Sequence, residues 1–392
     1  MRIAYLDPGL SSRKGHNAAM MAEFDHALVA ERGYQVSYLC AASADPGRFT
    51  DLRGRLIPTF RIDGYVRPSH TDLFDAQRFA RIGESIVADL ETLKDDDDFD
   101  PILMQTSYPL HLHALAQCSD LLQGRRVVIG MLLPCAFWGR DAHAERRISE
   151  LFASSVNELN RVADLFAYSE TGTFRFGDQL VPMATMLPPL SGASAGHLRR
   201  LAADSATGTR LETPTLGFFG SPFTSKGFGL LVEASQAIAR SGATPAARLA
   251  IRLPAGHEAV CQQLNALAPW IDAVSRQTSN QEYLADMAQV DVVCTLYDPQ
   301  EYAAKMSGII PEAISLGKPL LISEGCHAIQ DFLERHAPGS FICGQYAAQT
   351  LQNILALPPR SWERPTSCSR IHAPLMRQMK CMDRYLTVCG LE

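Results

Sequence analysis

The stretch YAAKMSGIIPEAISLGKPLLIS, residues 302–323, determines how the C-terminal half of this chain can fold. Pro311 has no N–H group and fits only the first turn of a helix, so a helix is predicted to begin near Ser307 or Gly308. Gly317 is predicted to end this helix, because glycine readily takes the left-handed conformation found after helix C-termini. The apolar residues that follow predict a buried strand.

A helix that begins here suits an anionic ligand. Its first amide groups have no partner within the helix, its dipole is positive at this end, and Gly308 has no side chain to block a close approach. Glu312 follows one turn later, where its carboxylate can accept hydrogen bonds from the hydroxyls of a ribose. The segment therefore predicts a site for a nucleoside diphosphate. The alternative is an ordinary helix with a surface glutamate between two buried strands.

Length and composition predict two α/β domains. The chain has 392 residues, which is too long for one ordinary core. Of these residues 46% are hydrophobic and 20% are charged, a composition that is typical of globular proteins. A net charge of -6 argues against a nucleic-acid partner. The ten cysteines form no C-x-x-C pair, so we expect neither disulfides nor zinc, and a reducing compartment. We expect no signal peptide and no membrane span.

Strands and helices alternate along the chain in the way that builds parallel sheets, with an interruption rich in small residues from Leu190 to Pro214. We predict an N-terminal Rossmann-like domain over residues 1–190, a linker over 191–213 and a C-terminal Rossmann-like domain over 214–373. Residues 374–392 are predicted to form a helix that packs either on the first domain or on the second. The predicted strands are Ile3–Leu6, Gln35–Cys40, Ile102–Gln105, Arg126–Leu132, Leu165–Tyr168, Thr215–Phe219, Leu249–Leu253, Val290–Leu296 and Pro319–Ile322.

The segment 302–323 resembles the signature of glycosyltransferase family 4 and its relatives, in which two glutamates seven residues apart precede a small-residue-Gly-Lys/Thr-Pro turn. Glu312 matches the second glutamate, whereas the first, which contacts the donor sugar in the family, falls on Ala304. A bacterial variant of the signature has a tyrosine, a basic residue and Ser-Gly. Tyr302, Lys305, Ser307 and Gly308 match that variant.

A second stretch, LGFFGSPFTSKGFGLLVEA over residues 216–234, resembles the family's strand, Gly-Arg, loop and Lys-Gly. Gly220, Lys226 and Gly227 are in register. The resemblance implies that Lys226 neutralises the leaving diphosphate and that Gly220 allows the phosphates to approach the backbone. Ser221 replaces the family's arginine, and Lys305 is a candidate to supply the missing cation.

The N-terminal half offers weaker candidates. Gly15 lies in the loop after the first strand, where relatives carry a glycine near the phosphates, and His16 is a candidate acceptor contact, although it can also cap a helix. Gln105 stands where relatives have a histidine. His111, or less favourably His113, is a candidate catalytic histidine, with a structural role as the alternative. The run KDDDDFD, 94–100, resembles a metal motif of other sugar transferases, but like charges in sequence usually form a solvated loop.

The resemblance implies a GT-B fold and transfer of a sugar from a UDP- or GDP-type donor to a glycan, lipid-linked or small-molecule acceptor. It also implies retention of anomeric configuration, no essential metal and no cofactor beyond the donor substrate. Surface polysaccharide or glycolipid synthesis is the implied role, in the cytoplasm or at the inner face of the membrane. The alternatives are a sugar-nucleotide epimerase of the same fold and a nucleotide-sugar binding protein without activity, which the replacements at Ala304 and Ser221 suggest.

Overall fold

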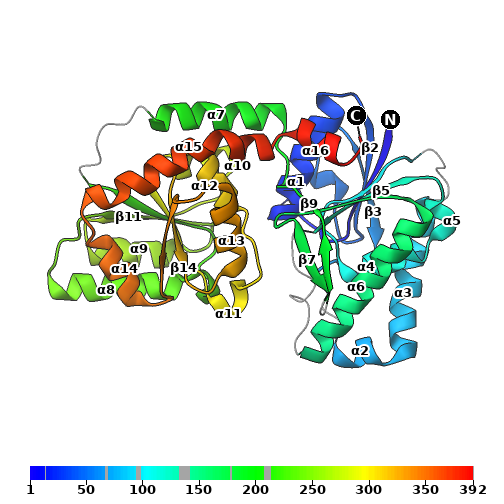
Figure 1. Ribbon diagram of the computed structural model, residues 1–392, viewed down its shortest axis with the longest axis horizontal. Coiled ribbons are helices and arrows are strands. Elements are labelled where there is room, and N and C mark those ends of the chain that lie inside the picture. The colour runs from blue at the N-terminus through cyan, green and yellow to red at the C-terminus, as the bar shows by residue number, and fades with distance from the viewer. Residues whose placement is uncertain are drawn as a thin grey trace. The chain divides into compact units, whose positions relative to one another are not determined.

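The structure is a computed structural model that describes residues 1–13, 15–66, 69–93, 99–131, 142–176, 179–206 and 213–391. The chain divides into two compact units (Figure 1). The first comprises Met1–Gly192 together with Lys380–Glu392, and the second comprises Ala193–Met379.

The N-terminal unit is built on a seven-stranded sheet in the order β3-β2-β1-β4-β5-β6-β9, and neighbouring strands are parallel. Parallel strands are covered on both faces, which explains why these segments are almost continuously apolar. A short antiparallel hairpin, β7 (Thr173–Phe176) with β8 (Gln179–Pro182), lies outside the sheet. The strands of the sheet are β1 (Arg2–Asp7), β2 (Gln35–Ala41), β3 (Arg55–Phe60), β4 (Ile102–Met104), β5 (Arg126–Met131), β6 (Asp164–Ser169) and β9 (Ala184–Thr185).

Alternate residues of β1 enter different cores, because successive side chains of a strand point to opposite faces. Ala4 and Leu6 pack in a core with α3, α4 and α6, whereas Ile3 and Tyr5 pack in another with α1 and α16. Figure 1 shows these two groups of helices on opposite faces of the sheet. The helices of this unit are α1 (His16–Phe24), which continues as a π-helix (Asp25–Ala30), α2 (His70–Phe74), α3 (Ala76–Leu90), α4 (Pro109–Ala116), α5 (Ser119–Leu122), α6 (Ala142–Val162) and α16 (Met382–Val388).

The C-terminal unit contains a six-stranded parallel sheet in the order β12-β11-β10-β13-β14-β15. Its strands are β10 (Thr215–Phe219), β11 (Arg248–Leu253), β12 (Ile271–Ser275), β13 (Val292–Thr295), β14 (Leu320–Ser323) and β15 (Phe341–Gly344). Its helices are α7 (Gly192–Ala206), α8 (Phe228–Ser241), α9 (Glu258–Leu267), α10 (Asn280–Ala288), α11 (Pro299–Tyr302), α12 (Ile309–Ser315), α13 (His327–His336), α14 (Ala348–Leu355) and α15 (Glu363–Met379).

Two helices differ from what the apolar pattern of the sequence predicts, which is one continuous helix from His111 to Leu122 and one that begins at Pro374. The segment from His111 to Leu122 is broken into α4 and α5 around Gln117 and Cys118, since the amide of Cys118 turns back to the carbonyl of Leu115. Pro374 does not begin the last helix but lies inside α15, where packing of Ala373, Met376 and Met379 offsets the lost backbone hydrogen bond. The chain then breaks after Met379, and α16 contributes Met382, Tyr385 and Leu386 to the N-terminal core.

None of the helices in the described part of the chain is long and apolar enough to cross a membrane.

Candidate active site

Each sheet has one point at which the strand order reverses. In the C-terminal sheet β10 and β13 are neighbours, and the chain continues from them in opposite directions, to β11 and β12 or to β14 and β15. In the N-terminal sheet β1 and β4 have the same relation. Loops that leave such a pair of strands diverge, so their carboxyl ends are the usual ligand sites of open α/β sheets. We call the two places the C-terminal and the N-terminal switch point.

The loop after β10 is fitted closely to the end of β13. Gly227 has φ +76°, and a Cβ atom there would lie 2.2 Å from the carbonyl oxygen of Leu296. The amide of Asp298 also donates to the carbonyl of Ser225 over 2.8 Å. Glycine is therefore required at 227, and the loop is held against the neighbouring strand at the C-terminal switch point.

Lys226 lies on this loop as a half-buried cation. Its ammonium nitrogen is 3.4 Å from the position that a Cβ atom at Gly220 would occupy, and Gly220 itself has φ +113°. Burial lowers the pKa of Lys226. Within the described ranges no carboxylate is paired with it, although buried charges in proteins are normally paired. The site therefore suits an anion. Ser221 is half-buried on the same loop.

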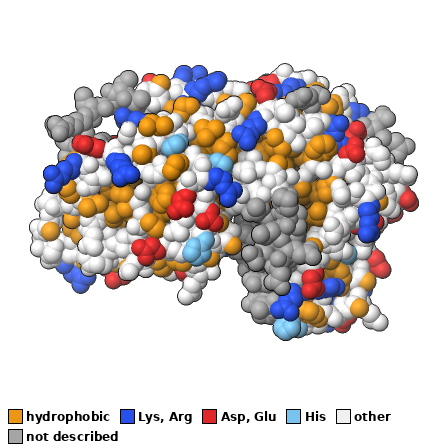
Figure 2. All heavy atoms as spheres, in the orientation of Figure 1, with side chains coloured by type: hydrophobic (Ala, Val, Ile, Leu, Met, Phe, Trp, Pro, Cys, Tyr) orange, Lys and Arg blue, Asp and Glu red, His pale blue; other side chains and the backbone are white. Residues whose placement is uncertain are grey.

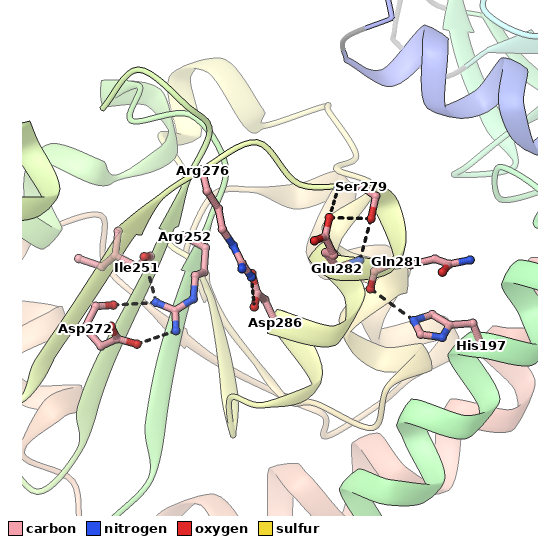
Figure 3. A network of polar contacts seen from close by, with 9 residues as sticks. All are labelled: His197, Ile251, Arg252, Asp272, Arg276, Ser279, Gln281, Glu282 and Asp286. Carbon is pink, nitrogen blue, oxygen red and sulfur yellow. Dashed lines mark hydrogen bonds and ion pairs between the residues drawn. The ribbon is translucent and has the colours of Figure 1, made fainter. Parts of the chain in front are cut away.

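Two arginines at the same edge of the sheet are already paired (Figure 3). Arg252 at the end of β11 donates to Asp272 over 2.6 Å, and Arg276 after β12 makes two 2.8 Å contacts with Asp286. In contrast to these two arginines, Lys226 has no carboxylate partner in the described part of the chain and is available to a ligand. Figure 2 shows that arginine and lysine side chains are interspersed with acidic and neutral ones on the face in view.

Helix α12 begins as predicted, with Gly308 as its N-cap and Pro311 in its first turn. Gly308 is exposed, and a Cβ atom there would meet nothing within 4 Å. Among the described residues, none accepts a hydrogen bond from the amide of Gly308 or Ile309. Gly317 ends the helix with φ +72°, which confirms the prediction for that residue. The start of α12 is thus open.

Aromatic side chains position the segment before α12. The hydroxyl groups of Tyr297 and Ser307 are 3.3 Å apart, and the rings of Tyr297 and Tyr302 stack with centroids 4.4 Å apart. Lys305 is buried, with its ammonium group 5.1 Å from the centre of the Tyr302 ring and 3.8 Å from the carboxylate of Glu301. Its charge is therefore partly balanced within the protein, unlike that of Lys226.

Glu312 is half-buried and contacts a residue that the sequence did not identify. The hydroxyl of Tyr283, from α10, donates to Oε2 of Glu312 over 3.1 Å. The ring of Tyr283 packs edge-on against Phe219 at the end of β10, with centroids 6.0 Å apart. Glu312 is thereby fixed relative to the C-terminal switch point. Ala304, which stands at the position of the first glutamate of the family signature, presents an exposed methyl group.

A buried polar network occupies the N-terminal switch point. The carboxylate of Asp7, at the end of β1, accepts hydrogen bonds from Asn17 Nδ2 at 2.6 Å and from the amide of Gly9 at 3.1 Å. Burial raises the pKa of Asp7 to about 7. Asn17 Nδ2 also donates to the hydroxyl of Tyr108 over 3.0 Å, and Tyr65 donates to Asn17 Oδ1 over 2.7 Å. This network joins residues that follow β1, β3 and β4.

Gly15 precedes α1 with φ +85° and open space at its Cβ position. His16 is the first residue of α1, but its side chain lies outside the described part of the structure. The same holds for residues 94–98 of the acidic run. Among the described residues there is no group of three or more His, Cys, Asp or Glu side chains that could hold a metal ion.

The histidines of α4 have different surroundings. His111 is only 2% exposed, and its Nε2 lies 2.8 Å from the carbonyl oxygen of Ile62. Burial lowers its pKa to about 4, so the ring is neutral at pH 7. This geometry suits a residue that positions the loop after β3. The side chain of His113 contacts Gln117 over 3.1 Å, and Gln105 accepts a hydrogen bond from Tyr168.

Solved structures share the architecture over the whole chain. HepE from Anabaena, crystallised in complex with UDP, is 14% identical with a TM-score of 0.59, over 100% of this chain and 98% of that chain. The UDP-forming α,α-trehalose-phosphate synthase of Burkholderia xenovorans is 13% identical with a TM-score of 0.58, over 99% and 98%. MurG of Acinetobacter baumannii is 13% identical with a TM-score of 0.56, over 100% and 99%. No protein-family model and no curated protein sequence matches the chain.

The two parallel sheets and this full-length likeness establish the fold class. The protein has the GT-B fold, with two Rossmann-like units, as the sequence predicted. Membership of glycosyltransferase family 4 in particular stays a prediction.

Proposed function

We propose that this protein is a glycosyltransferase that moves a sugar from a nucleoside-diphosphate sugar to a glycan, lipid-linked or small-molecule acceptor. The observation that carries the proposal is Lys226, a half-buried cation at the C-terminal switch point with no acidic partner in the described part of the chain. A diphosphate would supply the missing negative charge. The UDP in the HepE structure supports a donor of this kind.

In the proposed reaction the protein stabilises the leaving diphosphate. Lys226 contributes a positive charge close to Gly220, and the open start of α12 at Ser307 and Gly308 contributes amide donors. Lys305 adds a cation that is shared with Glu301. Together these groups would replace a metal ion, in line with the resemblance to family 4, which also supports retention of configuration.

Glu312 is proposed to bind the ribose of the donor. Tyr283 holds one carboxylate oxygen in place, which reduces the entropy lost when the hydroxyls of a ligand bind to the same group. The acceptor is assigned to the N-terminal unit, around the loop that contains Gly15 and His16. We assign His111 a positioning role for the loop after β3 instead of proton transfer, because of its burial. A role in surface polysaccharide or glycolipid synthesis, at the cytoplasmic face of a membrane, follows from the resemblance alone.

A second candidate is a nucleotide-sugar binding protein without transfer activity. It is favoured by Ala304, which provides no carboxylate where the family signature has one.

A panel of nucleotides separates these candidates. We expect UDP or GDP, and the matching sugar nucleotide, to raise the unfolding temperature in proportion to affinity, with ADP as the comparison. Slow release of free sugar from the bound donor, accelerated by an acceptor, supports the transferase. Binding without any turnover across all donors supports the binding protein, and absence of binding to every nucleotide refutes both.

A further inference from the structure

The loop after β3, residues 61–66, presents an aromatic side chain at the N-terminal switch point. Tyr65 is 49% exposed and Val66 is 50% exposed. Isolated exposed apolar residues are common on protein surfaces and need no explanation by themselves. This loop differs from such isolated residues, because several contacts hold it in place.

Two parts of the chain that are distant in sequence hold the loop, one at Pro8 and one at the start of α4. The imidazole of His111 contacts the carbonyl of Ile62 at 2.8 Å, and the amide of Gly64 donates to the carbonyl of Pro8 over 3.0 Å. A Cβ atom at Gly64 would lie 2.7 Å from the ring of Tyr108, so the loop backbone packs directly on that ring. Such a loop has little freedom to move.

Tyr65 itself is held at both ends. Its amide donates to the carboxylate of Asp63 over 2.8 Å, and its hydroxyl donates to Asn17 over 2.7 Å. Its ring meets Tyr108 edge-on, with centroids 5.5 Å apart and planes inclined by 72°. Because the hydroxyl is engaged in the buried network, the side chain offers carbon surface to solvent in a fixed orientation.

A fixed tyrosine is well suited to bind a sugar ring. One face of a pyranose consists of C–H groups and packs on an aromatic face, while its hydroxyls need polar partners nearby. A side chain that is already ordered loses little entropy on binding. The half-buried carboxylate of Asp63 lies beside Tyr65 as an acceptor for sugar hydroxyls.

From this arrangement we propose that Tyr65 is the stacking platform for a pyranose unit of the acceptor, with Asp63 accepting hydrogen bonds from its hydroxyls. The identification of this pyranose as part of the acceptor rests on the proposed function. Of the glycan, lipid-linked and small-molecule acceptors proposed above, the inference selects those that end in a saccharide. The location supports it, since Tyr65 is bound to Asn17 of α1, immediately after the loop that contains Gly15.

Saturation-transfer difference NMR on the full chain tests the platform directly. The probes are methyl β-D-glucopyranoside, methyl α-D-mannopyranoside and methyl β-D-galactopyranoside, each with aromatic protein protons irradiated. We expect at least one glycoside to receive saturation on its ring protons. Tyr65→Leu should reduce that signal at least tenfold, whereas Tyr65→Phe, which keeps the ring, should stay within threefold of the unmodified protein.

Phe74→Leu is the matched control, because Phe74 is 47% exposed in the same unit but lies on α2. It should leave the signal unchanged, and the unfolding temperatures of all variants show whether the fold is kept. The inference is overturned if no glycoside gives a signal, if Tyr65→Leu keeps it, or if Tyr65→Phe loses as much as Tyr65→Leu. UDP binding, measured on the same samples, reports on the donor site alone, so the absence of any glycoside signal from the unmodified protein while UDP binding is intact overturns only this inference.

Discussion

Replacing Gly227 with alanine tests the claim that the Lys226 loop is fitted against β13. Alanine in the left-handed conformation at φ +76° costs about 1–2 kcal/mol. Its Cβ atom would lie 2.2 Å from the carbonyl oxygen of Leu296, so the loop must shift. The shift weakens at least one hydrogen bond, such as that from the amide of Gly227 to Thr224, which adds about 1 kcal/mol. We therefore expect Gly227→Ala to destabilise the unit by about 2–3 kcal/mol.

Gly229 provides the control, two residues further along the chain. It lies in α8 with ordinary backbone angles, and a Cβ atom there would meet nothing within 4 Å. Alanine favours a helix over glycine by about 0.5–1 kcal/mol, so Gly229→Ala should stabilise the protein slightly.

Differential scanning calorimetry of the two variants measures the difference. For a unit of this size about 1 kcal/mol corresponds to about 2–4 °C, so the two unfolding temperatures should differ by roughly 5 °C or more. The Gly227→Ala variant should also bind UDP more weakly, because the displaced loop moves Lys226. Equal unfolding temperatures for the two variants would refute the close fit of the loop.

Two further predictions concern the carboxylates of the switch points. Glu312→Ala should weaken UDP binding about tenfold or more, since a hydrogen bond to a charged group contributes about 1.5–3 kcal/mol, and calorimetric titration that gives equal affinity would exclude the ribose contact. Asp7 has a folded-state pKa of about 7, above its ordinary value of 3.8, so the folded protein keeps a proton that the unfolded chain releases. Its contribution to stability must fall as pH rises from about 4 to about 7, by about 1.4 kcal/mol per pH unit, and then level off. Urea denaturation of the unmodified protein and of Asp7→Asn at pH 5 and pH 8 checks this, and parallel profiles would contradict it.

The sequence predicted the strand and helix alternation because it depends on local apolar patterns. It also predicted the start of α12, because Pro311 leaves a helix few positions at which to begin. Pro374 misled the same reasoning, since buried neighbours in α15 compensate for the missing hydrogen bond. A local rule fails where long-range packing offsets its energy.

The functional surroundings were harder to predict, because they depend on contacts between distant segments. Nothing near Glu312 in the sequence identifies Tyr283, which contacts it from another helix. The lack of an acidic partner for Lys226 among the residues that the structure describes and the fixed position of Tyr65 are likewise properties of the folded chain, not of a motif. His111 is a catalytic candidate by its position in the sequence, and only the folded chain shows the burial that favours the alternative, a structural role.

The most direct test of the donor site is UDP binding to a Gly308→Val variant, measured by isothermal titration calorimetry. Gly308 has φ -56°, which any residue adopts, and open space at its Cβ position, so the variant should fold with at most a small change in unfolding temperature. A side chain at this point would nevertheless stand between a diphosphate and the amide groups at the start of α12. We predict at least a tenfold loss of UDP affinity in a fully folded protein. UDP bound as tightly by the variant as by the unmodified chain would contradict the assignment of the nucleotide to this site.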